Sequence, residues 1–419
     1  MTGRRTPVRS RRSAREWIVR SVLAAGIAAV AYLGITDSLA HATEGADPAD
    51  AHRLAPWNGV ITAELAEDTF LRTPKASEES EAARLARLAL RQDATAAAAL
   101  YVLGQQAQLR NETRRANNLF RYSWLLSRRE LKVQLWSIEE AASRGDVDDA
   151  LRSYDVALRT SLRARTLLFP VLASALTEPA IRAGLLPIIE TRPMWTNAFV
   201  DYIATTEAEP AAAAAFFREA EGHGLLVDEN DRAALVNTLA ATEGSEAAWR
   251  YYQSFRSGVT ALRSRDPEFT LQVSTRTLFD WRTSEDAQLS AAIFGSEEGG
   301  MLDFAVPPTI GGVLLSQSQL LPPGTYLMEG RSSRIQQPER SQPYWTLKCR
   351  DGRELGRVTV PDSTQSKGRF QGEFQVPVDC PEQTLQLVAR ATDAIAGVAG
   401  QIDRAALISA QGSDADSLE

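Results

Sequence analysis

Small and apolar residues recur 34 positions apart in the first half of this 419-residue chain. Such a repeat length is typical of one helical hairpin, and small residues at its inner positions let two antiparallel helices touch. One hairpin cannot bury its apolar face alone, so a chain with this pattern stacks its hairpins. The repeating pairs are Ala107 and Ala141, Ala116 and Ala150, Phe120 and Tyr154, and Ser123 and Ala157.

The same segment, LYVLGQQAQLRNETRRANNLFRYSWLLSRR, adds Leu100, Leu103 and Gly104 at the spacings of the tetratricopeptide pattern. The chain resembles the tetratricopeptide repeat family, clearly over residues 76–160 and more loosely to residue 260. It departs from the family pattern at Ile138, where the family prefers glycine. The resemblance implies a right-handed stack of helix hairpins whose concave groove holds a peptide or a partner protein.

Four residues are the expected groove-facing positions of the repeats. For these polar positions, an ordinary solvated helix face is an equally simple interpretation. They are Tyr101, Gln105, Gln108 and Glu139.

After Asp266-Pro267 the helical periodicity gives way to alternation and Pro-Gly turns. Six or seven short strands at regular spacing, the first in GGVLLSQSQ and the last near GQIDRAALIS, predict an antiparallel β-sandwich or jelly roll. This strand pattern, with its closing GxIDxxxL element, is similar to jelly-roll carbohydrate-binding modules over about residues 278–410. The whole chain, an α+β multidomain protein with an α-solenoid before a β-sandwich, also resembles uncharacterised membrane-anchored bacterial tetratricopeptide proteins.

An uncharged run lies close to the N-terminus. Residues 21–36, SVLAAGIAAVAYLGIT, follow Trp17 and Arg20, residue types that suit a membrane interface. Because arginines keep the N-terminus inside, we expect a single-pass inner-membrane protein with a cytoplasmic N-terminus and a periplasmic body. The small residues around Ala40-His41-Ala42 leave a second interpretation open, in which the segment is a signal cleaved near Ala42 and the body is secreted to the periplasm.

These patterns divide the chain into seven expected segments. They are a basic cytoplasmic tail (1–20), an anchor or signal segment (21–36), a linker (37–53), a tetratricopeptide-like helical domain (54–260), a second linker (261–277), a β-sandwich domain (278–410) and a disordered tail (411–419).

The charge distribution argues against a nucleic-acid partner. Seven arginines, offset by Glu16 and Asp37, give residues 1–42 a net charge of +5, so the rest of this −7 chain carries −12. An acidic body lacks the cationic surface that a phosphate backbone requires.

The two cysteines, Cys349 and Cys380, lie 31 residues apart on expected neighbouring strands. Alternation points both toward the side of the large apolar residues. In an oxidising compartment they would form a disulfide, whereas the alternative is a pair of reduced core thiols.

The usual chemical motifs are missing. The chain has three histidines and no metal-ligand spacing, and it contains no GxSxG, no GxxxxGK[ST] and no GxGxxG after a strand. We therefore predict no metal, no cofactor and no enzymatic activity. A glycosidase needs only two suitably spaced carboxylates, so a carbohydrate-active hydrolase stays an alternative, although solvated acids explain the same residues. The candidate acids are Asp280, Glu329, Glu354 and Glu373.

For sugar binding, exposed aromatic rings beside polar side chains are the useful groups. Tyr344 is the best candidate, because alternation sends its neighbour Trp345 inward and Tyr344 outward. The other candidates are Trp281, which also suits a core position, Tyr326, Gln317 and Arg331.

Together these observations predict a non-catalytic periplasmic scaffold. We expect the solenoid to hold a protein partner and the β-sandwich to contact envelope polysaccharide. The alternatives are a structural sandwich without a glycan ligand and the hydrolase.

Overall fold

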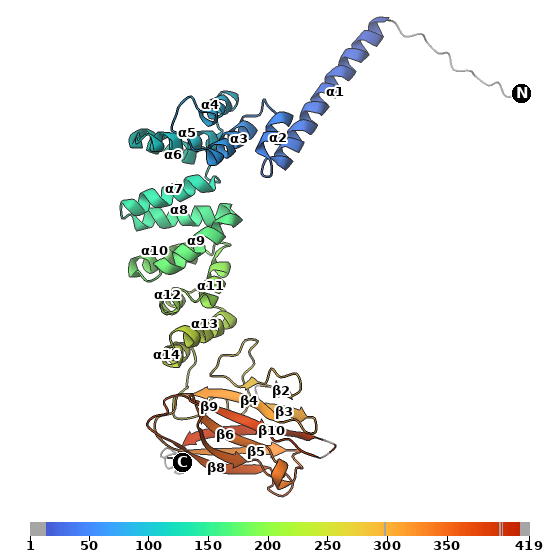
Figure 1. Cartoon of the computed structure of the whole chain (residues 1–419), viewed down its shortest axis with the longest axis vertical. Coiled ribbons are helices and arrows are strands. Elements are labelled where there is room, and N and C mark those ends of the chain that lie inside the picture. The colour runs from blue at the N-terminus through green and yellow to red at the C-terminus, as the bar shows by residue number, and fades with distance from the viewer. Residues whose placement is uncertain (1–13, 297–298, 394, 396, 411–419) are drawn as a thin grey trace, which may run out of the picture. The chain divides into compact units, whose positions relative to one another are not determined.

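The computed structural model describes residues 14–296, 299–393, 395 and 397–410. The expected tail at 411–419 and the first part of the basic tail lie outside these residues. The chain divides into two compact units, Met1–Leu168 and Phe169–Glu419. Within the described part, helices fill the N-terminal portion and two antiparallel sheets the C-terminal portion, so the predicted fold class, a helical solenoid followed by a β-sandwich, is confirmed (Figure 1).

The helices of the described residues form a nearly continuous series. They are α1 (Ala14–Thr43), α2 (Pro48–Leu54), α3 (Gly59–Arg72), α4 (Glu81–Gln92), α5 (Ala97–Leu109), α6 (Thr113–Leu126), α7 (Leu131–Ser143), α8 (Val147–Thr160), α9 (Leu162–Ala175), α10 (Pro179–Glu190), α11 (Thr196–Thr205), α12 (Pro210–Gly222), α13 (Glu229–Thr242) and α14 (Ser245–Phe255).

Short polar side chains define where several helices begin. Asn58, Ser80, Asp146 and Asp228 accept hydrogen bonds from backbone N–H groups in the first turns of α3, α4, α8 and α13. These bonds satisfy donors that have no partner inside a helix, and each such cap stabilises a helix by about 1 kcal/mol.

The small residues of the repeat lie where helices touch. Gly104 of α5 packs so closely on Phe120 of α6 that a Cβ atom at this position would lie 2.5 Å from the ring. Ala107 and Ala116 are buried in the same cluster. The next hairpin repeats the arrangement, since its equivalent residues Ala141, Ala150, Tyr154 and Ala157 are also buried.

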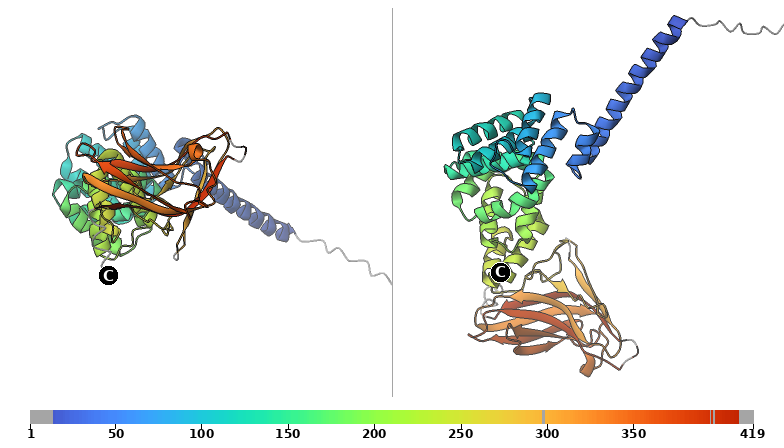
Figure 2. Two further views of the ribbon diagram at one scale, coloured as in Figure 1. Left: turned by 90° about the horizontal axis from the view of Figure 1, so that it is seen from below. Right: turned by 45° about the horizontal axis from the view of Figure 1, so that its top comes forward.

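The helix α1 projects from the helices that follow it in the first unit (Figure 1 and Figure 2). It contains an 18-residue stretch with a mean hydropathy of 2.0, no part of which is buried. Among the described residues it is the one helix long and apolar enough to cross a membrane, and a signal sequence near the N-terminus would meet the same criteria.

The C-terminal portion contains two five-stranded antiparallel sheets, with strand orders β1-β4-β9-β6-β7 and β2-β3-β10-β5-β8. A short helical turn, η1 (Glu339–Ser341), precedes β6. The strands are β1 (Arg282–Thr283), β2 (Ser290–Phe294), β3 (Met301–Val306), β4 (Gly312–Gln319), β5 (Gly324–Ser333), β6 (Tyr344–Cys349), β7 (Glu354–Thr359), β8 (Arg369–Val376), β9 (Gln383–Ala389) and β10 (Val398–Ser409).

The core of the sandwich is aromatic. Trp345 lies 5.6 Å from Trp281 and 6.5 Å from Phe370 between ring centroids, and Phe269 packs on Trp281. Phe269 belongs to the segment 261–277, which was expected to be a linker, but it is fully buried. The aromatic core therefore extends N-terminally beyond the first strand.

The expected count of six or seven strands was too low, because it began at β4. The strands β1 to β3 add the missing members at the edges of both sheets. β1 was overlooked because it has only two residues, and β2 because its outward positions include Ala292 and Phe294, which hide the alternation. On β8 the inward valine is Val376, whereas Val378 lies beyond the strand and is 86% exposed.

A disulfide joins Cys349 at the end of β6 to Cys380 just before β9, with Cα atoms 5.6 Å apart. Both residues are buried. The disulfide predicted from the sequence is thus present, and it fits an oxidising compartment.

Candidate functional site

The outward face of the sheet β1-β4-β9-β6-β7 carries an aromatic residue among polar side chains. Along β6, Trp345 and Leu347 are fully buried in the core, whereas Tyr344 and Lys348 are half-buried on the opposite side. This is the period-two alternation of a strand with one face on the core. It confirms that Tyr344 points outward.

The Tyr344 ring contacts two arginines from the neighbouring strands. The guanidinium carbon of Arg357 on β7 lies 4.6 Å from the ring centroid, and that of Arg390, which directly follows β9, lies 4.8 Å from it. Tyr344 pairs with Thr359 on one side and Val388 on the other, so the arginines approach from diagonally opposite positions. The ring therefore lies between the two guanidinium groups, in cation–π contact with both.

The two arginines differ in their other partners. Arg357 donates two hydrogen bonds to the carboxylate of Glu354, one of them 3.0 Å long. These bonds raise the pKa of Arg357 and lower the pKa of Glu354. Arg390 forms no ion pair within the described part of the chain, and its buried Nε has no hydrogen-bond partner there.

Polar groups beside the ring complete the arrangement. The buried Oε1 atom of Gln386 on β9 also has no partner among the described residues. We call the set Tyr344, Lys348, Arg357, Gln386 and Arg390 the Tyr344 face. It combines hydrogen-bond donors, an acceptor and an aromatic ring on one sheet surface, and it includes no pair of carboxylates for acid–base catalysis.

The Tyr344 residue lies at the end of the sheet opposite the disulfide, and loops at this end form a small cavity of about 300 Å³. Arg334 and Lys367 bring positive charge to it, and Ser333, Ser363 and Thr364 bring hydroxyl groups. Arg334, in the loop after β5, has a φ of 60°, and Lys367, in the loop before β8, has a φ of 53°. The cationic character of this end of the sandwich thus extends beyond the sheet surface.

Three of the predicted sugar-binding residues are in the interior. Trp281 is fully buried and donates from Nε1 to the carbonyl of Asp266, while the hydroxyl of Tyr326 donates to the carbonyl of Pro322. Gln317 is 1% exposed and accepts a hydrogen bond from the backbone N–H of Arg265. A sugar at the surface cannot reach these groups, so the prediction was wrong for Trp281, Tyr326 and Gln317.

The fourth, Arg331, is exposed but lies on β5 of the other sheet, 3.4 Å from a carboxylate oxygen of Asp403. The structure therefore does not bring Arg331 to the Tyr344 face. For Gln317 and Tyr326 the cause is that alternation within one strand does not say which of its two faces meets the core, whereas Trp281 precedes β1 and lies outside any strand.

The candidate acids of a hydrolase lie in separate places, except that Glu329 and Glu373 occupy diagonal outward positions on β5 and β8. Asp280 is 2% exposed and accepts hydrogen bonds from the Tyr252 hydroxyl and from the backbone and side chain of Thr277. Glu329 pairs with Arg404 at 3.3 Å. Glu354 is held by Arg357, as described above, and Glu373 is a solvent-exposed strand residue. Substrate cannot reach Asp280, whose hydrogen bonds give it a structural role.

Two of the four predicted groove residues, Tyr101 and Gln105, are half-buried and contact each other. Tyr101 is half-buried against Phe120, and its hydroxyl accepts a hydrogen bond from Gln105 at 2.8 Å. Burial raises the pKa of Tyr101. Gln108 and Glu139 are exposed and free to contact a partner.

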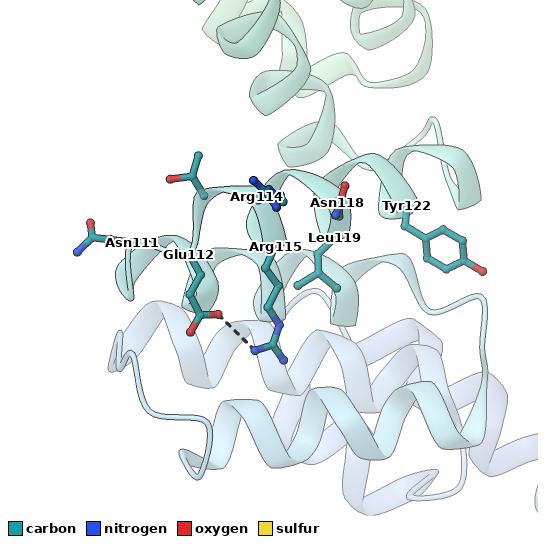
Figure 3. Close-up of a pocket in the computed structure, with 8 residues that line it drawn as sticks. Asn111, Glu112, Arg114, Arg115, Asn118, Leu119 and Tyr122 are labelled. Atoms are coloured by element: carbon teal, nitrogen blue, oxygen red, sulfur yellow. Dashed lines mark hydrogen bonds and ion pairs between the residues drawn. The ribbon is translucent and has the colours of Figure 1, made fainter.

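A separate open hollow of about 970 Å³ lies along α6 (Figure 3). Arg115 turns toward Glu112, with which it forms an ion pair, and Tyr122 projects from the helix. Tyr122 and Leu125 are 54% and 65% exposed on this helix. The hollow was not expected from the sequence, although apolar residues outside the core positions of the repeat are a signal that would have indicated it.

Among the described residues, no group of three or more His, Cys, Asp or Glu side chains is arranged to hold a metal ion. His223, which directly follows α12, lies 3.0 Å from a carboxylate oxygen of Glu190 at the end of α10, and His52 contacts the Thr62 hydroxyl.

No protein-family model and no curated protein matches the chain. Among solved structures, a CBM22-1 xylan-binding domain of Paenibacillus barcinonensis Xyn10C is 14% identical, with 37% of this chain and 96% of that chain covered and a TM-score of 0.25. TmCBM61 in complex with β-1,4-galactotriose is 17% identical, with coverages of 37% and 99% and a TM-score of 0.23. PilW, a type IV pilus biogenesis factor, is 15% identical, with coverages of 48% and 93% and a TM-score of 0.25.

With TM-scores of 0.25 or less, these likenesses carry no functional argument. The proposals below rest on the residues of this chain.

Sequence reasoning missed Arg357, Arg390, Gln386 and Lys348 as members of a site. Each lies at an outward strand position or directly after a strand, where a charged or amide side chain is ordinary. Only the strand order β9-β6-β7 places them around Tyr344.

Proposed function

We propose that this chain is a non-catalytic binding scaffold of the cell envelope. In this proposal the sandwich binds polysaccharide through the Tyr344 face, and the helical repeats hold a protein partner. The observation that carries the proposal is an outward aromatic ring, Tyr344, flanked by the partly exposed arginines Arg357 and Arg390.

A ligand rich in hydroxyl groups suits such a face, because each hydroxyl both donates and accepts a hydrogen bond. Polysaccharides offer many such groups along a strip that suits a flat sheet surface. The Tyr344 face offers the corresponding donors, the partly exposed Lys348 and Arg357, beside its aromatic ring.

For the protein partner, two surfaces of the first unit are available. Gln108 and Glu139 remain exposed as predicted groove positions. The α6 hollow is lined by the exposed Tyr122 and by Arg114, and Leu125 of the same helix adds exposed apolar area near it. Apolar patches with a polar rim mark protein interaction sites, which supports a protein partner for the repeats.

The end of α1 supports a retained membrane anchor over a cleaved signal. Ala40 is fully buried in a cluster with Ala51, Ala55 and Ile61. Cleavage near Ala42 would remove the α1 side of this cluster and leave its apolar partners exposed. We therefore propose a single-pass inner-membrane protein with a periplasmic body.

A mass measurement checks this point. The protein extracted from membranes of the producing cell is expected to keep residues 14–43, and to resist extraction by alkaline carbonate. As a control, replacing residues 21–36 with an established cleavable signal should release the body in soluble form. A mature N-terminus at residue 43 in the native protein would contradict the anchor.

The glycan proposal is tested by retention on purified envelope polysaccharides. The full chain in a mild detergent is expected to be retained, and Tyr344→Ala should weaken binding about tenfold, because removal of the ring frees both arginines from their fixed positions. Phe294→Ala is the matched control, since Phe294 is 61% exposed on β2 of the other sheet. If no polysaccharide retains the wild-type chain, the sandwich is not a glycan-binding module.

A further inference from the structure

We infer that the polysaccharide bound by the Tyr344 face is acidic, and that Arg357 and Arg390 bind its carboxylate groups. This inference rests on the proposed glycan-binding function and names the class of ligand. Three features of the face support it: the Tyr344 ring is flanked by two arginines, Arg390 lacks a carboxylate partner among the described residues, and cations outnumber carboxylates on this face.

The first feature concerns the tyrosine ring. An aromatic residue that binds a neutral sugar offers an open ring face to the C–H groups of a pyranose. Here guanidinium groups lie 4.6 and 4.8 Å from the centroid of the Tyr344 ring, from diagonally opposite positions. The ring therefore positions two cations, and a ligand meets the N–H edges of the arginines instead of the ring.

The second feature is the state of the two arginines. Arg357 is already held by Glu354, which fixes its orientation. Arg390 has no carboxylate partner within the described residues. A guanidinium fork matches the geometry of a carboxylate and binds it through two parallel hydrogen bonds, so a carboxylate is the ligand group that Arg390 lacks.

The third feature is charge complementarity. Arg357, Arg390 and Lys348 place three cations on the face, and Glu354 pairs with Arg357 and lies near Lys348. Residues 43–419 carry a net charge of −12, so a cationic face on this body is a local exception. The loop cavity with Arg334 and Lys367 extends positive charge at the same end of the sandwich. An acidic chain would be attracted to this end and repelled by the rest of the protein.

Nucleic acid and anionic lipid carry phosphate charge and are the competing classes of ligand. A uronic-acid chain is favoured because its planar carboxylates match the guanidinium fork of Arg390 in two parallel hydrogen bonds, and its hydroxyl groups can accept from Lys348 and Arg357. Binding to a lipid surface would also need an exposed apolar or strongly basic element beside the site. On this face the carboxylate of Glu354 instead neutralises part of the positive charge by pairing with Arg357.

The test compares two ligands with one backbone. The full chain in detergent is titrated with polygalacturonate and with the same polymer after reduction of its carboxyl groups to alcohols. We expect binding to polygalacturonate that is at least about tenfold tighter than to the reduced polymer, and that weakens as salt is raised from low to high concentration. Equal affinity for both polymers would overturn the inference while leaving the proposed glycan binding intact.

Variants assign the effect to the face. Arg390→Gln should weaken binding to polygalacturonate about tenfold, and Arg390→Lys, which keeps the charge but loses the fork, should fall between it and wild type. Arg350→Gln removes the same charge from a 78% exposed side chain at the opposite end of the sheet and should change affinity less than about twofold. Thermal unfolding of each variant, expected near that of wild type, verifies that the fold is kept.

The remaining outcomes are also decisive. Equal losses in Arg390→Gln and Arg350→Gln would show non-specific attraction and overturn the inference. A second contradicting result is tighter binding to double-stranded DNA or to phosphatidylserine vesicles than to polygalacturonate, with this binding lost in Arg390→Gln. That result would show that the face binds phosphate groups, and it would overturn the inference as well. Failure to bind either polymer or any envelope polysaccharide would instead remove the proposed function itself.

Discussion

Replacing Arg265 with alanine is expected to lower the free energy of unfolding of the unit that contains the sandwich by about 3 to 5 kcal/mol. The Arg265 side chain is 6% exposed and donates hydrogen bonds to the carbonyls of Phe279 and Ser318 and to Oε1 of Gln319. Its guanidinium group also lies 5.2 Å from the Trp249 ring of α14. Burial lowers the pKa of Arg265 to about 10, so it stays charged at neutral pH.

The expected loss is large because the surroundings of Arg265 are buried and polar. Alanine would leave the three acceptor oxygens without donors, and each such oxygen costs about 1 to 3 kcal/mol. It would also remove the nearby cation that offsets the charge of Asp280, which is held by Tyr252 and Thr277. Arg265 thus links α14, the segment before β1 and the end of β4 into one polar network.

Chemical denaturation of the wild type and the variant measures this effect. The matched control is Arg282→Ala, whose side chain is 48% exposed and lies 3.9 Å from a carboxylate oxygen of Glu285, itself 93% exposed. A surface pair of this kind contributes about 0 to 1 kcal/mol. A loss below about 1 kcal/mol in Arg265→Ala would show that the network relaxes around the missing side chain.

Breaking the Cys349–Cys380 disulfide is expected to cost the sandwich about 3 to 4 kcal/mol. The bond closes a loop of 31 residues, and the chain-entropy description assigns this stabilisation to the restricted unfolded state. The double variant Cys349→Ser and Cys380→Ser adds the cost of burying two hydroxyl groups at positions 6% and 2% exposed.

The measurement compares denaturation of the wild type with and without a thiol reductant, and the double variant under both conditions. Reductant should destabilise the wild type and leave the double variant unchanged. An unchanged wild type would mean that the bond contributes nothing to stability. Since α7 and α8 contain no cysteine, helical unfolding in the first unit serves as an internal reference.

Part of the candidate site was predictable from the sequence. Alternation in PYWTLKC assigned Trp345 to the core and Tyr344 to the surface, because successive side chains of a strand point to opposite faces. The same reasoning did not work for Tyr326, which alternation permits on either face and which the structure buries. Nor did it work for Asp280, which precedes β1 and is buried against Tyr252 of α14, a helix that comes earlier in the sequence.

The sequence by itself determined the elements that depend on local patterns. The 34-residue recurrence specified the helical hairpins, because each hairpin is held by contacts between residues close in sequence. The contact of Gly104 with Phe120 is an example. Alternation and turn residues specified most strands of the sandwich, and the paired cysteines specified the disulfide.

Only the tertiary structure decided which strands are neighbours. Arg357 and Arg390 meet Tyr344 because β6 lies between β7 and β9, although β8 separates β7 from β9 along the chain. Sheet order depends on contacts between residues distant in sequence, which burial of the whole core selects and no local pattern records.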